Sequence, residues 1–300
     1  MDKQNLLDDE TIALLESRDL NIRSLMDGMF GGKRRSAYYG TSMEFADYRE
    51  YAPGDDIRRI DWNLYGRLDK LYLKLFTDER RQHHRIYIDC SASMAWGEPE
   101  KRLTALRLAS VLGYLAVNGM DMVSWYALED KKCRRVTDGV STRDALFQGI
   151  DKLGELRCEG DTGIGESLTL SPSPGFHDGI SFLISDLLTD SDWKSAVDWL
   201  LYKKQDVCVI QVLSRDEISP SLNGKLFLMD SESKDEDDER NRRMTVNRQR
   251  LTAYAAAYEW LENDIKSFCD SRQARFFCVP TGEPISRILF DRAVRSEMIQ

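Results

Sequence analysis

RIYIDCSASMAWGEPEKRLTALRLASVLGYLAV, residues 85–117, is the stretch that decides the fold. Its first residues, RIYID, are apolar and aromatic and predict a short buried strand. From Lys101 onward, leucines and valines recur at helical spacing, and Pro99 stands just before them, where it favours a helix start. A strand, a short polar loop and a helix in this order indicate the beginning of an α/β domain.

The same alternation continues to residue 279. Amphipathic helical patterns occupy residues 142–153, 190–204 and 248–271. The expected further strands are residues 122–129, 132–136, 179–186, 206–213 and 274–279. The last three are continuous apolar runs, as in strands that are covered by helices on both faces. The pattern predicts a doubly wound, mostly parallel sheet, whose ligands bind outside the carboxyl ends of the strands.

Composition limits the classes of protein. The chain has 300 residues, of which 42% are hydrophobic and 31% charged, which excludes a disordered or fibrous protein. Its net charge of −9 argues against a protein that coats nucleic acid. There is neither an apolar run long enough to span a membrane nor the pattern of a signal peptide at the amino terminus. We therefore expect a cytoplasmic protein with no membrane span and no nucleic-acid partner.

Cysteine and histidine usage restricts metal chemistry. The six cysteines are scattered and form no CxxC pair, which predicts reduced thiols. With only three histidines in the chain, a metal site has to rely on oxygen ligands.

The charge distribution suggests two parts. Residues 33–85 hold twelve Lys/Arg and nine Asp/Glu, whereas the chain as a whole is acidic. We expect residues 1–84 to form an amino-terminal helix and an Arg- and aromatic-rich, β-containing segment. Residues 85–300 should form the α/β domain, with a charged hairpin insertion near residues 214–247. Within that insertion, the acidic run at residues 230–243 is expected to be a solvated loop.

A candidate metal site follows from the strand ends. Asp89 ends the first strand and is followed by the hydroxyls of Ser91 and Ser93, while Asp186 ends a second strand. The loop at residues 157–165 presents Asp161 and Thr162 at the same edge, although Thr169 and Thr189 compete with Thr162 for this role. Such oxygen donors suit Mg²⁺ or Mn²⁺. The alternative is that the Asp and the two Ser only cap the following helix.

The DxSxS loop, the loop Thr and the strand-end Asp together resemble the metal-ion-dependent adhesion site of von Willebrand factor A domains. This resemblance implies one metal ion bound by Asp89, Ser91, Ser93, Thr162 and Asp186. In such sites the hydroxyls bind the metal directly, the acids act partly through water, and an acidic residue of the partner fills the open position. Two residues depart from the common pattern: Cys90, and Leu187, which stands where glycine is common.

EFADYREYAPGDDIRRIDWNLYGRLDKLYLKLFTDER, residues 44–80, is similar nearly position for position to the signature of a bacterial family called domain of unknown function 58. In that family the signature precedes a von Willebrand A-like domain. Its members are typically encoded beside MoxR-type AAA+ ATPases, which implies an adaptor or co-chaperone working with such an ATPase. Within this signature segment we expect most arginines to pair with aspartates, and Trp62 to pack against its neighbours.

Two functions compete. One is a binding module, not an enzyme, that holds Mg²⁺ or Mn²⁺ and grips an acidic residue of a protein partner, a MoxR-type ATPase or its client. The other is a Mg²⁺-dependent, phosphatase-like hydrolase that uses the Asp89 loop. Phosphatases with an aspartyl nucleophile need a second acid two residues later, where this chain has Ser91. We therefore favour the binding module.

Overall fold

The computed structural model divides the chain into two compact units, Met1–Phe30 with Gln82–Gln300, and Gly31–Arg81. The residues that the structure describes are 6–17, 44–53, 55–77, 81–161, 163–170, 179–189, 191–222, 224–228, 242–284 and 288.

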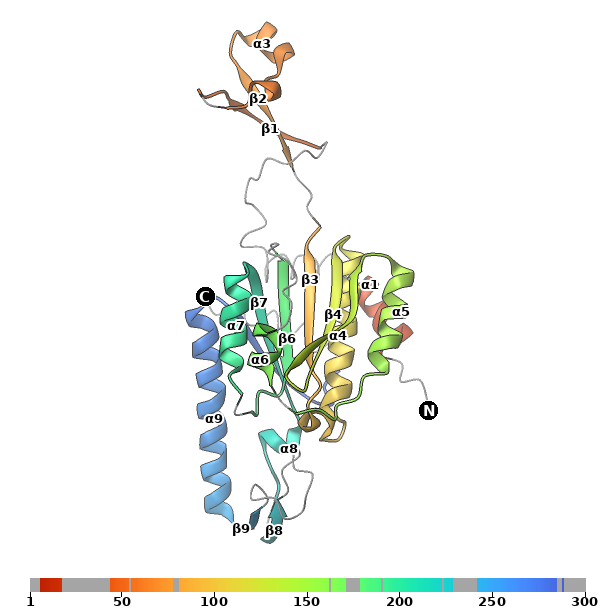
Figure 1. The fold of residues 1–300 in the computed structure, drawn as a ribbon, viewed down its shortest axis with the longest axis vertical. Coiled ribbons are helices and arrows are strands. Elements are labelled where there is room, and N and C mark those ends of the chain that lie inside the picture. Colours follow the sequence, from red (N-terminus) through yellow and green to blue (C-terminus); the bar gives the residue numbers. More distant parts are fainter. Residues whose placement is uncertain are drawn as a thin grey trace. The chain divides into compact units, whose positions relative to one another are not determined.

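The first unit is built on a six-stranded sheet with the order β10-β7-β6-β3-β4-β5 (Figure 1). All neighbouring strands run parallel except β4 and β5, which are antiparallel. The strands are β3 (His83–Asp89), β4 (Met122–Glu129), β5 (Lys132–Val140), β6 (Gly179–Ser185), β7 (Gln205–Leu213) and β10 (Arg275–Pro280). The predicted fold class, a doubly wound, mostly parallel α/β sheet, is confirmed.

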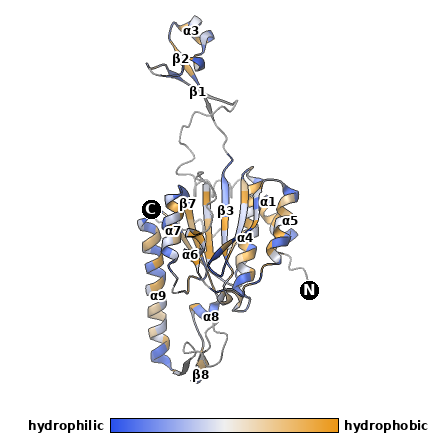
Figure 2. Ribbon diagram, in the orientation of Figure 1, coloured by the Kyte–Doolittle hydropathy of each residue, from blue (hydrophilic) through white to orange (hydrophobic). Residues whose placement is uncertain are grey.

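Helices cover both faces of this sheet, as the continuous apolar strands predict. Ile86 and Ile88 of β3 join one core cluster, and Tyr87, which points the other way, joins a second. The first cluster includes residues of α1 (Asp9–Ser17), α4 (Lys101–Asn118) and α5 (Arg143–Gly154). The second includes residues of α6 (Ile164–Thr169), α7 (Trp193–Tyr202) and α9 (Arg248–Ser271). Figure 2 shows hydrophobic residues along the central strands.

The side chain of Trp125 lies so close to two helix positions, Gly113 and Gly149, that only glycine fits there. A Cβ added to Gly113 of α4 would lie 2.2 Å from the indole, and one added to Gly149 of α5 would lie 2.5 Å from it. The indole Nε1–H donates to the carbonyl of Ala109 at 3.0 Å, so its polar atom is satisfied although the side chain is fully buried. The two helices therefore approach the sheet as closely as this side chain allows.

Helix α1 belongs to this unit, since the buried Leu15 lies in the first core cluster. From the sequence we had grouped this helix with the signature segment. The hairpin strands β8 (Gly224–Leu228) and β9 (Arg242–Val246) pair antiparallel, as expected for an insertion after β7. Residues 230–241, most of the acidic run predicted at 230–243, lie outside the described residues.

The second unit contains the signature segment, residues 44–80, of which the structure describes 44–53 and 55–77. Strands β1 (Glu44–Glu50) and β2 (Tyr72–Thr77) pair antiparallel, and a short helix, α3 (Trp62–Leu68), lies between them in the chain. Arg49 pairs with Asp55 at 2.7 Å, which is one pair of the kind predicted for most of the arginines. Trp62 packs edge-to-face against Tyr65, with ring centroids 6.2 Å apart, although 63% of it is exposed. Trp62 begins α3, a helix of seven residues, none of which is buried. The helix therefore contributes no buried residue to the core of this unit.

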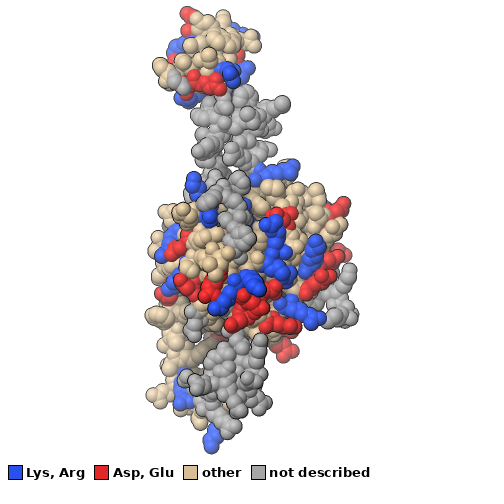
Figure 3. Space-filling model, viewed as in Figure 1, with Lys and Arg blue, Asp and Glu red and all other residues tan. Residues whose placement is uncertain are grey.

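The cysteines and the surface charges agree with the composition of the chain. All six cysteines are free thiols, as predicted. On the face of the first unit that Figure 3 shows, Lys and Arg side chains are interspersed with Asp and Glu side chains. No helix among the described residues has the length and apolar character that crossing a bilayer requires.

Candidate metal centre

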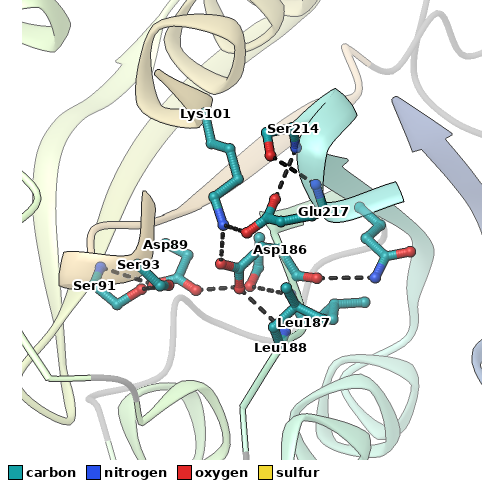
Figure 4. A network of polar contacts seen from close by, with 11 residues as sticks. Asp89, Ser91, Ser93, Lys101, Asp186, Leu187, Leu188, Ser214 and Glu217 are labelled. Carbon is teal, nitrogen blue, oxygen red and sulfur yellow. Dashed lines mark hydrogen bonds and ion pairs between the residues drawn. The ribbon is translucent and has the colours of Figure 1, made fainter. Parts of the chain in front are cut away.

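The first loop of the candidate site follows β3. Asp89 is buried, and its Oδ1 accepts a hydrogen bond from the backbone N–H of Ser91 at 2.9 Å. The Oγ atoms of Ser91 and Ser93 are 3.0 Å apart, so the two hydroxyls point to a common position (Figure 4). Neither Ser makes the side-chain cap that the alternative interpretation requires: the short helix Ala92–Ala95 has Ser91 at its N-cap without a capping bond. The two hydroxyls bond to each other instead, and they cap neither this helix nor α4, whose N-cap is Glu100.

The third loop follows β6, the neighbour of β3. Because these two strands are parallel, with Ile88 opposite Ile184, both end at the same edge of the sheet. Asp186 is buried there, and its Oδ1 accepts from the backbone N–H of Leu188 at 3.1 Å. Leu187, where glycine is common, has φ of +54°, the left-handed region that glycine adopts most readily. The departure from the family pattern therefore falls on a strained backbone position.

Ser185 joins the two loops. Its hydroxyl donates to Asp89 Oδ2 at 2.6 Å and accepts from the backbone N–H of Leu187 at 3.0 Å. A short bond to a buried carboxylate is strong because the acceptor is charged. Ser185 therefore fixes the distance between the first and third loops.

The second loop lies beside the first. Ser91 forms an isolated parallel bridge with Gly160, and the backbone N–H of Ala92 donates to the Gly160 carbonyl at 2.9 Å. Thr162, two residues further on, lies outside the described residues. Its competitors have other partners: the Thr169 hydroxyl donates to a carbonyl within α6, and the Thr189 hydroxyl accepts from the N–H of Ser191.

The electrostatics of this edge favour a cation. Burial, and then the charge of Asp186, raise the pKa of Asp89 to about 6, although hydrogen bonds from Ser185 and Ser91 lower it. Two carboxylates with little access to water repel each other, and a bound cation relieves this repulsion.

The structure adds a residue that the sequence analysis missed. Lys101, the first residue of α4, reaches into the same cluster, where its Nζ donates to Asp186 Oδ2 at 2.7 Å and to Glu217 Oε1 at 2.6 Å (Figure 4). Only 1% of its side chain is exposed. A lysine at the start of an amphipathic helix usually points to solvent, so nothing in the sequence indicates that Lys101 is buried. Only its contacts with Asp186 and Glu217 place it in the cluster.

Glu217 belongs to the short helix α8 (Arg215–Ile218), which follows β7. Its Oε2 accepts from the backbone N–H of Ser214 at 2.8 Å, and Ser214 Oγ accepts from the N–H of Glu217 at 3.2 Å. This reciprocal capping box holds the carboxylate in place. The sequence signal was present, since a Ser followed three residues later by Glu is typical of such a cap.

The donor set fits a small divalent cation. It contains two hydroxyls and two buried carboxylates, all oxygen, as Mg²⁺ and Mn²⁺ prefer. The carboxylates of Asp186 and Glu217 pair with the ammonium of Lys101, and the neighbouring Asp89 brings the formal charge of the cluster to two minus. Within the described ranges, no three His, Cys, Asp or Glu side chains form a metal-binding group. A metal here would therefore depend on the serine hydroxyls.

Histidine catalysis at this edge finds no support among the described residues. His83 and His84 begin β3 and so lie at the opposite end of the strand from Asp89. His177 falls outside the described part of the chain. No observation favours the hydrolase that we considered as an alternative.

Comparisons with known proteins find a similar sequence in Mycobacterium tuberculosis and similar solved structures. An uncharacterized protein of Mycobacterium tuberculosis is 23% identical over 230 residues, which cover 75% of this chain and 72% of that protein. Among solved structures, the conserved hypothetical protein BatB from Bacteroides thetaiotaomicron is 15% identical with a TM-score of 0.44, covering 73% of this chain and 100% of that one. The VWA domain of SpRpn10 is 9% identical with a TM-score of 0.40, covering 72% and 95%.

The family comparison is more extensive. Residues 47–259 match the family described as "Protein of unknown function DUF58". The match begins within the signature segment and includes both acid-bearing strand ends, the loop between them and the helix that carries Lys101. Because it spans more than half of the 300 residues, the chain belongs to the DUF58 family.

Proposed function

We propose that this protein is a metal-dependent protein-interaction module and not an enzyme. The cation is Mg²⁺ or Mn²⁺, and its ligands are Asp89, Ser91, Ser93, Thr162 and Asp186. One observation carries this proposal: two buried acids from neighbouring strands meet two hydroxyls 3.0 Å apart at one sheet edge. Lys101 pairs with Asp186 but not with Asp89, whose buried carboxylate has lost its hydration without gaining a counter-charge among the described residues, so a bound cation would be favourable there.

In this proposal each residue has a distinct task. The hydroxyls of Ser91 and Ser93 bind the ion, and Asp89 and Asp186 supply the negative charge, partly through water. Ser185 keeps the two acid loops together. The bound ion supplies an open coordination position for a carboxylate of the partner.

The surroundings support a protein as the partner. Trp96 follows the first loop and Leu188 belongs to the third, and they are 48% and 42% exposed. Exposed apolar side chains beside a buried polar cluster are typical of protein interaction sites, in which anchors of this kind surround a polar contact. The resemblance to DUF58 members makes a MoxR-type AAA+ ATPase, or one of its clients, the first partner to test.

Cation binding is tested by calorimetric titration with Mn²⁺ and Mg²⁺. We expect one site in the wild type, no binding in Asp89→Ala, and at least about tenfold weaker binding in Ser91→Ala. Ser110→Ala is the matched control, because that buried hydroxyl donates to a carbonyl within α4. Equal affinity in all four proteins would refute the proposed site.

Partner binding is tested with a purified MoxR-type ATPase from the same organism, in Mg²⁺ and in EDTA. We expect binding that needs Mg²⁺, that Asp89→Ala abolishes, and that Trp96→Ala weakens without changing the affinity for the cation. A Mg²⁺-dependent turnover of phosphate monoesters that is lost in Asp89→Asn would overturn the proposal in favour of a hydrolase.

A further inference from the structure

Lys101 is a buried cation inside the candidate metal centre. Its ammonium bridges Asp186 on the third loop and Glu217 on α8, at 2.7 and 2.6 Å. The side chains of Lys101 and Asp186 are each 1% exposed, and that of Glu217 is 15% exposed. Removing a lysine from water this completely costs several kcal/mol unless it is paired, so the two carboxylates determine where the ammonium lies.

The ammonium already neutralises one oxygen of Asp186, the acid that the proposed ion would share with Asp89. Of the two oxygens of this carboxylate, Oδ1 accepts from a neutral backbone N–H and Oδ2 from Lys101. Asp89, in contrast, accepts only neutral donors in the contacts that the structure describes, the N–H of Ser91 and the hydroxyl of Ser185. The two acids that would share one ion are therefore unequally neutralised.

A divalent ion and this ammonium cannot both bind Asp186 closely without strong repulsion. At a separation of about 5 Å and an effective dielectric constant of about 20, a charge of two and a charge of one repel by several kcal/mol. Glu217 offers an alternative position, because it already accepts from Lys101 and is held by its capping box with Ser214.

We propose that Lys101 is an internal competitor of the metal ion for Asp186, and that Glu217 is the carboxylate that retains its ammonium when the ion binds. This inference rests on the proposed cation site and adds its regulation: the affinity for the cation is set by the balance of Lys101 between two carboxylates. Glu217, on a helix outside the three metal loops, then controls the site by holding the competitor.

The proposal predicts opposite effects for the two partners. Lys101→Met removes the competitor, and we expect the Kd for Mn²⁺ to fall at least about tenfold. Glu217→Gln retains the cap but removes the charge that draws Lys101 away from Asp186, and we expect that Kd to rise by about threefold to tenfold. Calorimetric titration, or the paramagnetic signal of free Mn²⁺, measures both values.

A double variant separates competition from simple charge. Lys101→Met with Glu217→Gln has the same formal charge at the site as the wild type, but no ammonium. If Lys101 competes for Asp186, the double variant still binds Mn²⁺ more tightly than the wild type. If only net charge matters, the two Kd values are equal, and the proposal is wrong. Because it leaves one carboxylate fewer without a counter-charge than Lys101→Met does, this variant also decides the matter should the single variant fail to fold.

The matched control is Lys194→Met, which removes a lysine from a 2.8 Å ion pair with Asp264 that joins α7 to α9. Both of these side chains are more than a third exposed, so we expect no change in Mn²⁺ affinity. A similar gain in Lys194→Met and in Lys101→Met would mean that removing any lysine is sufficient, and would overturn the proposal.

The result for the wild type is independent of this test. If the wild type does not bind Mn²⁺ but the double variant does, the competition stands and the proposed metal-dependent function fails. If the wild type binds Mn²⁺ and neither variant that lacks Lys101 binds it more tightly, the metal site stands and the competition fails. Absence of binding in all of them overturns both.

Discussion

Asp89 and Asp186 occupy equivalent positions, at the carboxyl ends of neighbouring parallel strands, yet their surroundings differ. Asp89 accepts hydrogen bonds from a backbone N–H and from a serine hydroxyl, and its pKa is raised to about 6. Asp186 accepts from a backbone N–H and from the buried ammonium of Lys101. The side chains across the loop thus determine which charges and hydrogen bonds surround a strand-end acid, and topology alone does not decide them.

The sharpest way to break this comparison is to neutralise each acid in turn without changing its shape. In Asp186→Asn, the ammonium of Lys101 keeps only Glu217 as a charged partner while it stays buried. We expect the free energy of unfolding to fall by about 2–4 kcal/mol, because losing one partner of a buried ion pair leaves charge uncompensated. Urea unfolding in EDTA measures this. A loss below about 1 kcal/mol would show that Glu217 alone satisfies Lys101.

The same change at Asp89 should act in the opposite direction. Because the folded pKa of about 6 exceeds the ordinary value of 3.8, ionising Asp89 costs stability once the pH is above the folded pKa. In EDTA at pH 7.5, Asp89→Asn is expected to raise the free energy of unfolding by about 1–3 kcal/mol.

The pH dependence provides the check on Asp89. The metal-free wild type should lose stability as the pH rises from about 4 to about 7, and the Asn variant should lose less over this range. If Asp89→Asn is instead as destabilising as Asp186→Asn, the two acids are equivalent and the comparison fails.

Ser185 tests whether the loops depend on each other. Its hydroxyl bonds to Asp89 and to the backbone of Leu187, so Ser185→Ala removes a charge-assisted bond and leaves a buried N–H unpaired. We expect a loss of about 1.5–3 kcal/mol. Ser181, a buried serine on the same strand that donates to Gln205, is the control, with an expected loss near 1 kcal/mol. Equal losses at both positions would mean that Ser185 has no special linking role.

The fold was accessible from the sequence because it depends on local periodicity. The strand at residues 85–89, the helix that begins at Lys101 and the strand-end acids were all predicted from apolar spacing and from the rule that parallel strands end at one edge. Asp89 and Asp186 do meet there. The role of Thr162 stays a prediction, because that residue is outside the described part of the chain.

What the sequence did not predict depends on contacts between distant residues. Lys101 and Glu217 are separated by 116 positions, and no periodicity links them. Ser185 looked like part of an apolar strand, and its importance comes from Asp89, which lies 96 positions away. Leu187 was noted as a departure from the family pattern, but only the backbone angle explains why glycine is common there.

Leu187 provides the smallest and most local comparison, between a left-handed position and an ordinary strand position. It is 2% exposed and has φ of +54°, whereas Leu183 is fully buried within β6. Replacing either leucine costs core packing. At a positive φ, however, glycine avoids the steric cost that alanine bears, of about 1 kcal/mol. We therefore expect Leu187→Gly to be more stable than Leu187→Ala by about that amount.

At Leu183 the order should reverse. In a regular strand, glycine loses about 0.5–1 kcal/mol relative to alanine, because more backbone freedom is lost on folding. Both pairs remove the same side chain, so the cavity contribution largely cancels within each pair and the difference isolates the backbone. Thermal and urea unfolding of the four variants measure it. If Leu187→Ala is as stable as Leu187→Gly or more stable, the backbone of the third loop is not strained. The first and third loops would then differ only in the charges that surround Asp89 and Asp186.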